Sequence, residues 1–157
     1  MYKQIIIVRR DLDMSIGKTS AQVAHGSMAF LTNIIRNNVT ELTKNGYFIL
    51  NESDMEDEND LVYRCEYDFD KDLYEQWING EFTKVVLQAR NKNHLLKAKT
   101  MAEEFGMKEG DDFFLIKDSC RTELEPEEDG RTLTCIGFKP MDAEIIEKIG
   151  RKYQLYK

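Results

Sequence analysis

Residues 2–25 read YKQIIIVRRDLDMSIGKTSAQVAH, and this stretch decides the fold. The run Ile5-Ile6-Ile7-Val8 is β-branched and too short for a helix, so Lys3 to Arg9 is predicted to form a buried strand. A short polar turn leads into a helix predicted from Gly17 to about Arg36. Because the first N–H groups of a helix have no partner within it, a helix start with Lys18 beside it suits an anion.

The predicted helix carries two stripes of side chains at helical spacing. An apolar stripe, expected to face the core, consists of Ala21, Ala24, Met28, Leu31 and Ile35. A mostly polar stripe consists of Lys18, Gln22, His25, Ala29 and Arg36. A solvated lysine at a helix end and a structural histidine at the border of the stripes are the simple alternatives to a functional role.

Further elements follow from hydrophobic periodicity and from glycine and proline stops. They are possible strands at 47–50 and 61–67 around an acidic loop, a short helix at 70–79 stopped by Gly80, strands at 85–87, 113–116 and 132–138, and helices at 91–105 and 141–149. This order predicts an α/β fold with a mixed, mostly parallel four-stranded sheet and helices on both faces. We expect a single three-layer domain over 1–157, in which residues 37–75 form an insertion with a β-hairpin or short helix.

Charge is distributed unevenly along the chain. Between Asn51 and Glu75, eleven acidic residues outnumber the two basic ones, so this stretch has a net charge of −9 within a whole-chain charge of −7. The remaining residues therefore carry about +2, which leaves a polyanionic ligand open. A solvated loop is the simplest interpretation of the acidic run. The chain shows no membrane-spanning stretch or signal pattern, and its three cysteines form no CxxC pair, so we expect a cytoplasmic protein.

Functional groups in α/β sheets gather beyond the carboxyl ends of parallel strands, which selects the loops at 11–18 and 118–122. A nucleotide-binding P-loop needs a glycine at position 12, where this chain has Leu12. Asp118-Ser119-Cys120-Arg121-Thr122 is either a plain polar turn or a reactive loop. A nucleophile pair of Cys120 with His25 is a further alternative, although nothing in the sequence brings the two together. With two histidines and no clustered thiols, neither a metal site nor a cofactor is expected.

Taken together, these residues resemble the type II peptidyl-tRNA hydrolases over everything except roughly residues 37–75. The matching pieces are Gln4 to Arg9, Asp11, Met14, Gly17-Lys18, Ala21-Gln22-Val23-Ala24-His25, Trp77, Gly80, Lys84-Val85-Val86-Leu87, Asp118, Arg121-Thr122, Thr132 and Ile136-Gly137. The resemblance is specific because the helix motif and the D-x-x-R-T loop occur in the family's order.

The resemblance implies an enzyme that hydrolyses the ester between a peptide and the 3′ ribose of tRNA, releasing free tRNA and peptide. By position, Lys18, Asp118 and Thr122 match residues implicated in the family's active site. Gln22, His25 and Arg121 match its motif more loosely, as substrate-binding residues. The mechanism expected is metal-free: Asp118 orients or deprotonates a water, and Lys18 stabilises the oxyanion or a terminal phosphate.

Three features depart from the family pattern. Ser119-Cys120 replaces a usual Ala-Gly, so the backbone turn that glycine allows can differ here. The turn before Lys18 lacks the usual lysines, and the acidic insertion is added. These departures leave open a non-catalytic binding or regulatory module with the insertion as its partner surface, and an enzyme acting on a small phosphorylated or acyl substrate. Peptidyl-tRNA, a second copy of the chain in a homodimer and a protein at the insertion are the partners considered.

Overall fold

The computed structural model describes residues 1–43, 46, 61–127 and 129–157. Their contacts divide into two units, one formed by Met1–Phe30 with Phe69–Lys157 and the other by Leu31–Asp68. The larger unit holds one six-stranded sheet, and the smaller holds a two-stranded hairpin. No helix among the described residues is long and apolar enough to cross a membrane.

The larger unit contains nearly all of the regular structure. Its elements are β1 (Tyr2–Arg9), the first part of α1 (Ile16–Asn37), α2 (Lys71–Leu73), the π-helix η3 (Tyr74–Glu81), β4 (Lys84–Ala89), α3 (Lys92–Glu104), β5 (Phe113–Asp118), β6 (Thr132–Phe138), β7 (Met141–Asp142), α4 (Ala143–Gly150) and β8 (Gln154–Leu155). The strands and helices predicted within this unit are therefore found, with ends that differ by one to a few residues.

The sheet has the order β5-β6-β1-β4-β8, and β7 pairs with one end of β1. Only β1 and β4 are parallel neighbours; β6 is antiparallel to both β1 and β5, and β8 is antiparallel to β4. The α/β class is confirmed, but neighbouring strands are mostly antiparallel rather than mostly parallel. Because two antiparallel steps restore direction, β5 still points the same way as β1 and β4. The carboxyl ends of these three strands therefore share one edge of the sheet.

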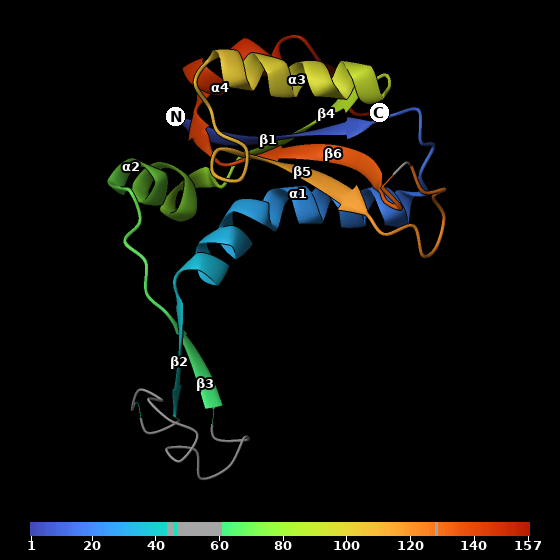
Figure 1. Ribbon diagram of the computed structural model, residues 1–157. Helices are drawn as coiled ribbons and strands as arrows, with labels where there is room; N and C mark the ends of the chain where they lie inside the picture. The colour runs from blue at the N-terminus through green and yellow to red at the C-terminus, as the bar shows by residue number, and fades with distance from the viewer. Residues whose placement is uncertain (44–45, 47–60, 128) are drawn as a thin grey trace. The chain divides into compact units, whose positions relative to one another are not determined.

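Helices cover both faces of the sheet, which confirms the three-layer prediction. Figure 1 shows α3 and α4 on one face and α1 on the other. The α3/α4 face buries the larger apolar cluster, with Ile5, Ile7, Phe113 and Ile136 from the strands. The opposite face buries a smaller cluster around Ile6, Val8 and Cys135. Alternate residues of β1 thus serve the two cores, as expected for a central strand.

Helix α1 faces the sheet with a different side from the one predicted. Its buried residues are Gln22, Gly26 and Phe30, whereas Ala21 and Ala24 of the predicted apolar stripe are exposed, as is Met28. The prediction failed because two of the three buried positions hold a glutamine and a glycine, which a search for an apolar stripe does not select. The polar stripe therefore contributes to the interior, and it brings Gln22 toward the end of β5.

A close crossing of two glycines brings α1 against the sheet. A β-carbon added at Gly137 in β6 would overlap the carbonyl group of Gly26 in α1. Gln4 of β1 reinforces the crossing, because its side-chain amide donates to the Ser27 carbonyl oxygen at 2.9 Å and to the Phe138 carbonyl oxygen at 2.9 Å. Gly137 is thus required by space rather than by a special backbone angle, and a β-carbon at Gly26 would lie 3.0 Å from the Ile6 side chain.

Gly137→Ala should lower the free energy of unfolding by about 3 kcal/mol or more, since backbone rather than a flexible side chain blocks the added methyl group. Chemical denaturation of both proteins measures the difference. Gly17→Ala is the matched control, because nothing lies within 4 Å of a β-carbon there, and it should leave stability unchanged or slightly raised. Equal stability of the two variants would contradict the close crossing.

The predicted insertion contains a hairpin and a short helical segment. Strand β3 (Leu61–Cys65) falls within the predicted 61–67 strand, but its antiparallel partner is β2 (Val39–Thr43). The predicted strand at 47–50 lies outside the described residues. The predicted helix at 70–79 is found as α2 followed by η3, with Trp77 buried and Gly80 in a non-helical conformation. Asp70 caps α2 by accepting the Leu73 N–H.

Candidate active site

Three of the predicted catalytic side chains meet at the shared carboxyl edge of the sheet. Lys18 comes from the first turn of α1, Asp118 ends β5, and Thr122 lies in the loop that follows. The Lys18 Nζ lies 2.8 Å from Asp118 Oδ2 and donates to Thr122 Oγ1 at 3.1 Å. The Lys18 and Asp118 side chains are only 13% and 10% exposed, so water screens this ion pair weakly.

The Asp118 carboxylate is held by donors from three parts of the chain. Besides Lys18, the Gln22 amide donates to Oδ2 at 3.0 Å and the Cys120 backbone N–H donates to Oδ1 at 2.8 Å. Burial alone would raise the pKa of Asp118, but the hydrogen bonds from Lys18 and Cys120, the lysine charge and the Gln22 bond together lower that pKa below its usual value. Asp118 is therefore an anion at neutral pH.

Thr134 orients the amide that reaches Asp118. Its hydroxyl donates to Gln22 Oε1 at 2.6 Å and lies 3.1 Å from the Ile116 carbonyl oxygen. With Oε1 engaged as an acceptor, the amide nitrogen of Gln22 points to the carboxylate. The sequence does not single out Thr134, which lies within the predicted strand at 132–138; the signal that identifies it is its place on β6 beside β5.

A carboxylate of the chain itself binds the residue that precedes α1. Ser15 caps the helix by accepting the Lys18 backbone N–H at 3.2 Å. The Glu123 carboxylate accepts the Ser15 backbone N–H at 3.1 Å and also its hydroxyl. These bonds lower the pKa of Glu123. Glu123 therefore ties the Thr122 loop to the residue that caps α1.

Cys120 keeps the turn that glycine would favour. Its φ of 56° lies in the left-handed region, and this conformation aims its N–H at Asp118. The thiol lies 3.3 Å from Thr132 Oγ1. The departure from Ala-Gly therefore leaves the turn in place at a cost in backbone strain.

We expect Cys120→Gly to keep the turn and the bond to Asp118. Cys120→Val should lower the free energy of unfolding by about 1–2 kcal/mol more than Cys120→Gly, because a β-branched residue is strained at positive φ. The valine variant should also lose activity as the N–H leaves Asp118. Denaturant melts and turnover of both variants provide the comparison, and full activity with valine would show that the turn is dispensable.

A buried arginine fixes the other end of the loop. Arg9, at the end of β1, donates to Glu127 at 2.7 Å, to Asp11 at 2.8 Å and to the Leu133 carbonyl oxygen at 2.9 Å. Lys92 adds a bond to Glu127 at 2.8 Å. Burial opposes ionisation of Glu127, yet the bonds from Lys92 and Arg9 outweigh it and lower its pKa from 4.5 to about 2. This network anchors the return of the loop to β6.

The two remaining predicted residues do not join the cluster. His25 is exposed on α1 and, among the described residues, has no hydrogen bond or ion pair with Asp118, Lys18 or Thr122. Arg121 is exposed next to Thr122 in the loop. No contact pairs His25 with the Cys120 thiol in the described part of the chain, so the structure gives no support to a cysteine–histidine nucleophile.

Counting donors and acceptors shows what the cluster offers to a ligand. A carboxylate has about four acceptor positions, and Asp118 uses three of them. An ammonium has three N–H donors, of which Lys18 uses two. The Thr122 hydroxyl accepts from Lys18, which leaves its own proton to donate. One acceptor, one charged donor and one neutral donor are thus available at one place. Within the described residues, no group of three or more His, Cys, Asp or Glu is placed to hold a metal ion.

Comparisons with known proteins point to one family. The family model described as "Peptidyl-tRNA hydrolase PTH2" matches residues 2–156. A peptidyl-tRNA hydrolase of Methanopyrus kandleri is 32% identical over 150 residues, which cover 95% of this chain and 93% of that protein. Those of Thermoplasma acidophilum and Sulfolobus acidocaldarius are 26% and 29% identical, covering 98% and 94% of this chain and 97% and 93% of their own lengths.

Proposed function

Because this chain belongs to the peptidyl-tRNA hydrolase family PTH2, we propose that it hydrolyses the ester joining peptide to tRNA with Lys18, Asp118 and Thr122 as its catalytic centre. These three residues are assigned to the catalytic centre because their side chains meet at one place. Side chains separated by a hundred residues in sequence lie within hydrogen-bond distance at the edge where α/β enzymes place their sites.

Lys18 and Thr122 supply the donors for the reacting carbonyl. When water attacks the ester, the carbonyl oxygen gains negative charge in the tetrahedral intermediate. The free N–H of Lys18 and the free O–H of Thr122 stabilise that charge. Asp118 and the loop fix both groups in advance, so little reorganisation accompanies the reaction.

Asp118 holds the attacking water through its one remaining acceptor position. Its lowered pKa makes it a weak proton acceptor, so its main contribution is to orient the water and to keep Lys18 in place. Gln22 completes this support by holding Oδ2. Of the two roles expected for Asp118, orienting the water and deprotonating it, we therefore propose that orientation contributes more.

The three residues predicted to bind substrate differ in their relation to this centre. Gln22 positions Asp118 and acts on substrate only through it. His25 and Arg121 are exposed, and each lies within a few residues of a cluster residue in the sequence. We propose that they contact the peptide or the tRNA end. We propose that the whole of 1–157 works as one hydrolase domain with 37–75 as its insertion, in the cytoplasm, where peptidyl-tRNA arises.

Purified protein and an N-acetylaminoacyl-tRNA provide the test of function. We expect multiple turnovers, measured as released tRNA, without added metal or cofactor. tRNA binding without release would instead indicate the binding or regulatory module, an alternative that the comparisons do not favour. Hydrolysis of a small acyl ester with no turnover of the tRNA ester would indicate the small-substrate enzyme.

We propose two further partners. Ala21, Ala24 and Met28 are exposed on one side of α1, which supports pairing of two copies in a homodimer. The acidic run between Asn51 and Glu75 supports a basic protein as a further partner. Sedimentation of the wild type and of Met28→Glu distinguishes a dimer from a monomer.

A further inference from the structure

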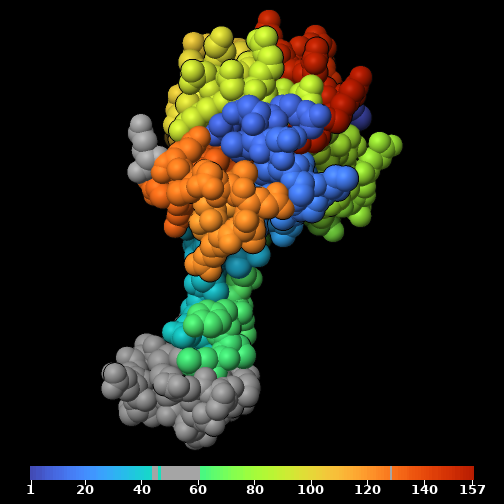
Figure 2. Space-filling view, turned by 90° about the vertical axis from the view of Figure 1, so that its right-hand side faces the viewer, coloured from blue at the N-terminus to red at the C-terminus, as the bar shows by residue number. Residues whose placement is uncertain are grey.

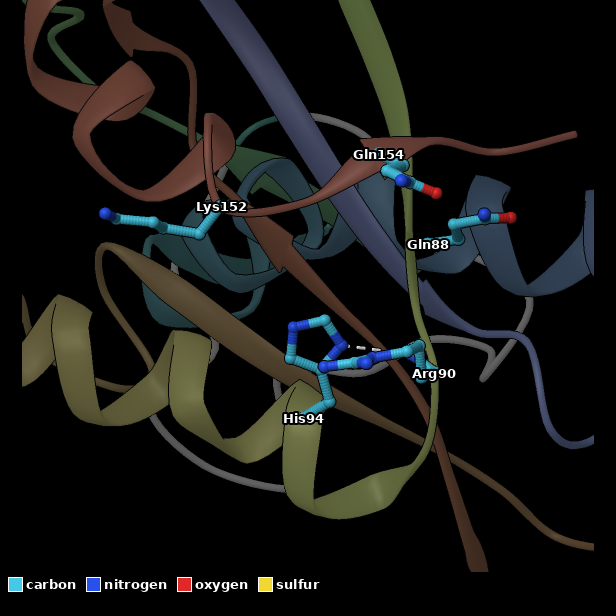
Figure 3. A pocket seen from close by; sticks show the side chains of 5 residues that line it. All are labelled: Gln88, Arg90, His94, Lys152 and Gln154. Carbon is cyan, nitrogen blue, oxygen red and sulfur yellow. Dashed lines mark hydrogen bonds between the residues drawn. The ribbon is translucent and has the colours of Figure 1, made fainter.

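A second group of polar residues lies at the same sheet edge, away from Lys18 and Asp118. A cavity of about 240 Å³ is lined by Gln88, Arg90, His94, Lys152 and Gln154. Figure 3 shows Arg90 extending toward the His94 ring from the end of β4, with Lys152 on the other side of that ring. Gln88 and Gln154 are paired across β4 and β8 and line the cavity beside them.

The cations around this cavity are not neutralised by carboxylates. Arg90, Lys152 and the neighbouring Arg10 have no ion pair within the described part of the chain, although other lysines and arginines of this acidic protein do. Asp11 and Glu127, which follow β1 and β5, are already bound by Arg9 and Lys92. Three cations without an ion pair among the described residues therefore lie at one edge of the sheet, where an external anion can reach them.

Aromatic contacts hold two of these groups in place without neutralising them. The Arg10 guanidinium lies 5.3 Å from the centroid of the Tyr156 ring. His94 stacks on Tyr153 at 4.7 Å and accepts the Arg90 backbone N–H at 3.1 Å through Nδ1, which leaves its other ring nitrogen to donate. Burial, with the charges of Arg90 and Lys97, lowers the pKa of His94, as expected where the potential is positive.

These residues share one face with the catalytic loop. The hydrogen bond from Arg10 N to the Ala89 carbonyl oxygen sets Arg10 beside Arg90 at the ends of the parallel pair β1 and β4. Figure 2 looks at this edge of the sheet: the blue loop after β1 lies between the red C-terminal segment with the yellow-green α3 and the orange loop after β5. A polyanion lying across this face can therefore contact both regions.

We propose that Arg10, Arg90 and Lys152 with His94 form a phosphate-binding face that holds the sugar-phosphate backbone of the tRNA part of the substrate while its 3′ end reaches Lys18 and Asp118. The proposal rests on the hydrolase function proposed above. Three cations contact phosphates and carry no base specificity, so the face recognises tRNA by charge and shape. It also supplies positive charge that the turn before Lys18 lacks in this chain.

The test compares Arg90→Gln/Lys152→Gln with a charge-matched control, Lys108→Gln/Lys148→Gln. Both control lysines are exposed, and Lys108 follows the far end of α3 from His94. On peptidyl-tRNA, the Arg90/Lys152 variant should show a KM raised about three- to tenfold at unchanged kcat. Its salt slope for tRNA binding should be shallower by about one to two, and the control should match the wild type.

An N-acetylaminoacyl ester of adenosine separates this proposal from the catalytic one. It lacks the phosphates, so the wild type and the Arg90/Lys152 variant should hydrolyse it equally. An unchanged KM on peptidyl-tRNA overturns the phosphate face while the hydrolase function stands, as does an equal effect of the control variant. Wild-type protein that releases no tRNA overturns the hydrolase function itself. Binding of a glutamate-rich peptide in preference to tRNA assigns the face to an acidic protein and also overturns the proposal.

Discussion

Asp118→Asn should lower kcat/KM for peptidyl-tRNA by at least about a hundredfold, the usual scale for losing such a group. The amide keeps the shape of the side chain but removes the charge that faces Lys18 at 2.8 Å, and its NH₂ group cannot accept the Gln22 and Cys120 donors together with a water. Initial rates of tRNA release under conditions of saturating and limiting substrate provide the measurement.

Asp129→Asn is the matched control for this variant. Asp129 lies in the same loop and also pairs with a lysine, Lys117, but that pair is exposed. Its loss should change kcat/KM by less than about twofold. A similar loss in both variants would mean that the loop as a whole, rather than the Asp118 charge, governs the rate.

Lys18→Met should also lower kcat by about a hundredfold or more, because it removes the charged donor for the oxyanion. It should in addition move the acid limb of the pH–rate profile upward. Lys18 supplies both a hydrogen bond and a positive charge that lower the pKa of Asp118, so without it that pKa rises. Residual activity then falls off at a higher pH than in the wild type as Asp118 becomes protonated.

The pH profile distinguishes this role from a merely structural one. A variant that is only less stable would have a lower rate at every pH, but the acid limb of its pH–rate profile would stay at the same pH. Lys117→Met, in the exposed pair with Asp129, serves as control and should leave both the rate and the profile unchanged. Thermal melts of all the variants show whether the carboxylate left without its lysine partner lowers stability as well.

Much of the fold could be predicted because the apolar runs are unambiguous. Ile5-Ile6-Ile7-Val8 forms the central strand, and β5 and β6 follow their predicted ranges closely. The pairing of the strands was predicted less well. Strands that alternate with helices along the sequence suggest parallel neighbours, whereas β6 pairs antiparallel with both β1 and β5. The position of the site depends only on the direction in which each strand runs. Because β1, β4 and β5 run the same way, their carboxyl ends meet at one edge as predicted.

Periodicity failed on α1 for a physical reason. Periodicity identifies the side of a helix that is richest in apolar residues. In α1, however, the close crossing with β6 requires a glycine, and the bond to Asp118 requires a buried glutamine. The most hydrophobic face was therefore left to solvent. The positions of Lys18, Asp118 and Thr122 in the cluster were predicted through the strand-end rule and the family resemblance, whereas Thr134 and Glu123 became visible only through their contacts.

A double-mutant cycle tests the central claim most directly, namely that Lys18 and Asp118 act as one unit on the ester. The rates of peptidyl-tRNA hydrolysis are measured for the wild type, Lys18→Met, Asp118→Asn and the double variant. If the two residues act as one unit, the first substitution already removes most of their joint contribution to the rate. The double variant should then be about as slow as the slower single variant. Losses that multiply, making the double variant about ten-thousandfold slower, would contradict a shared role.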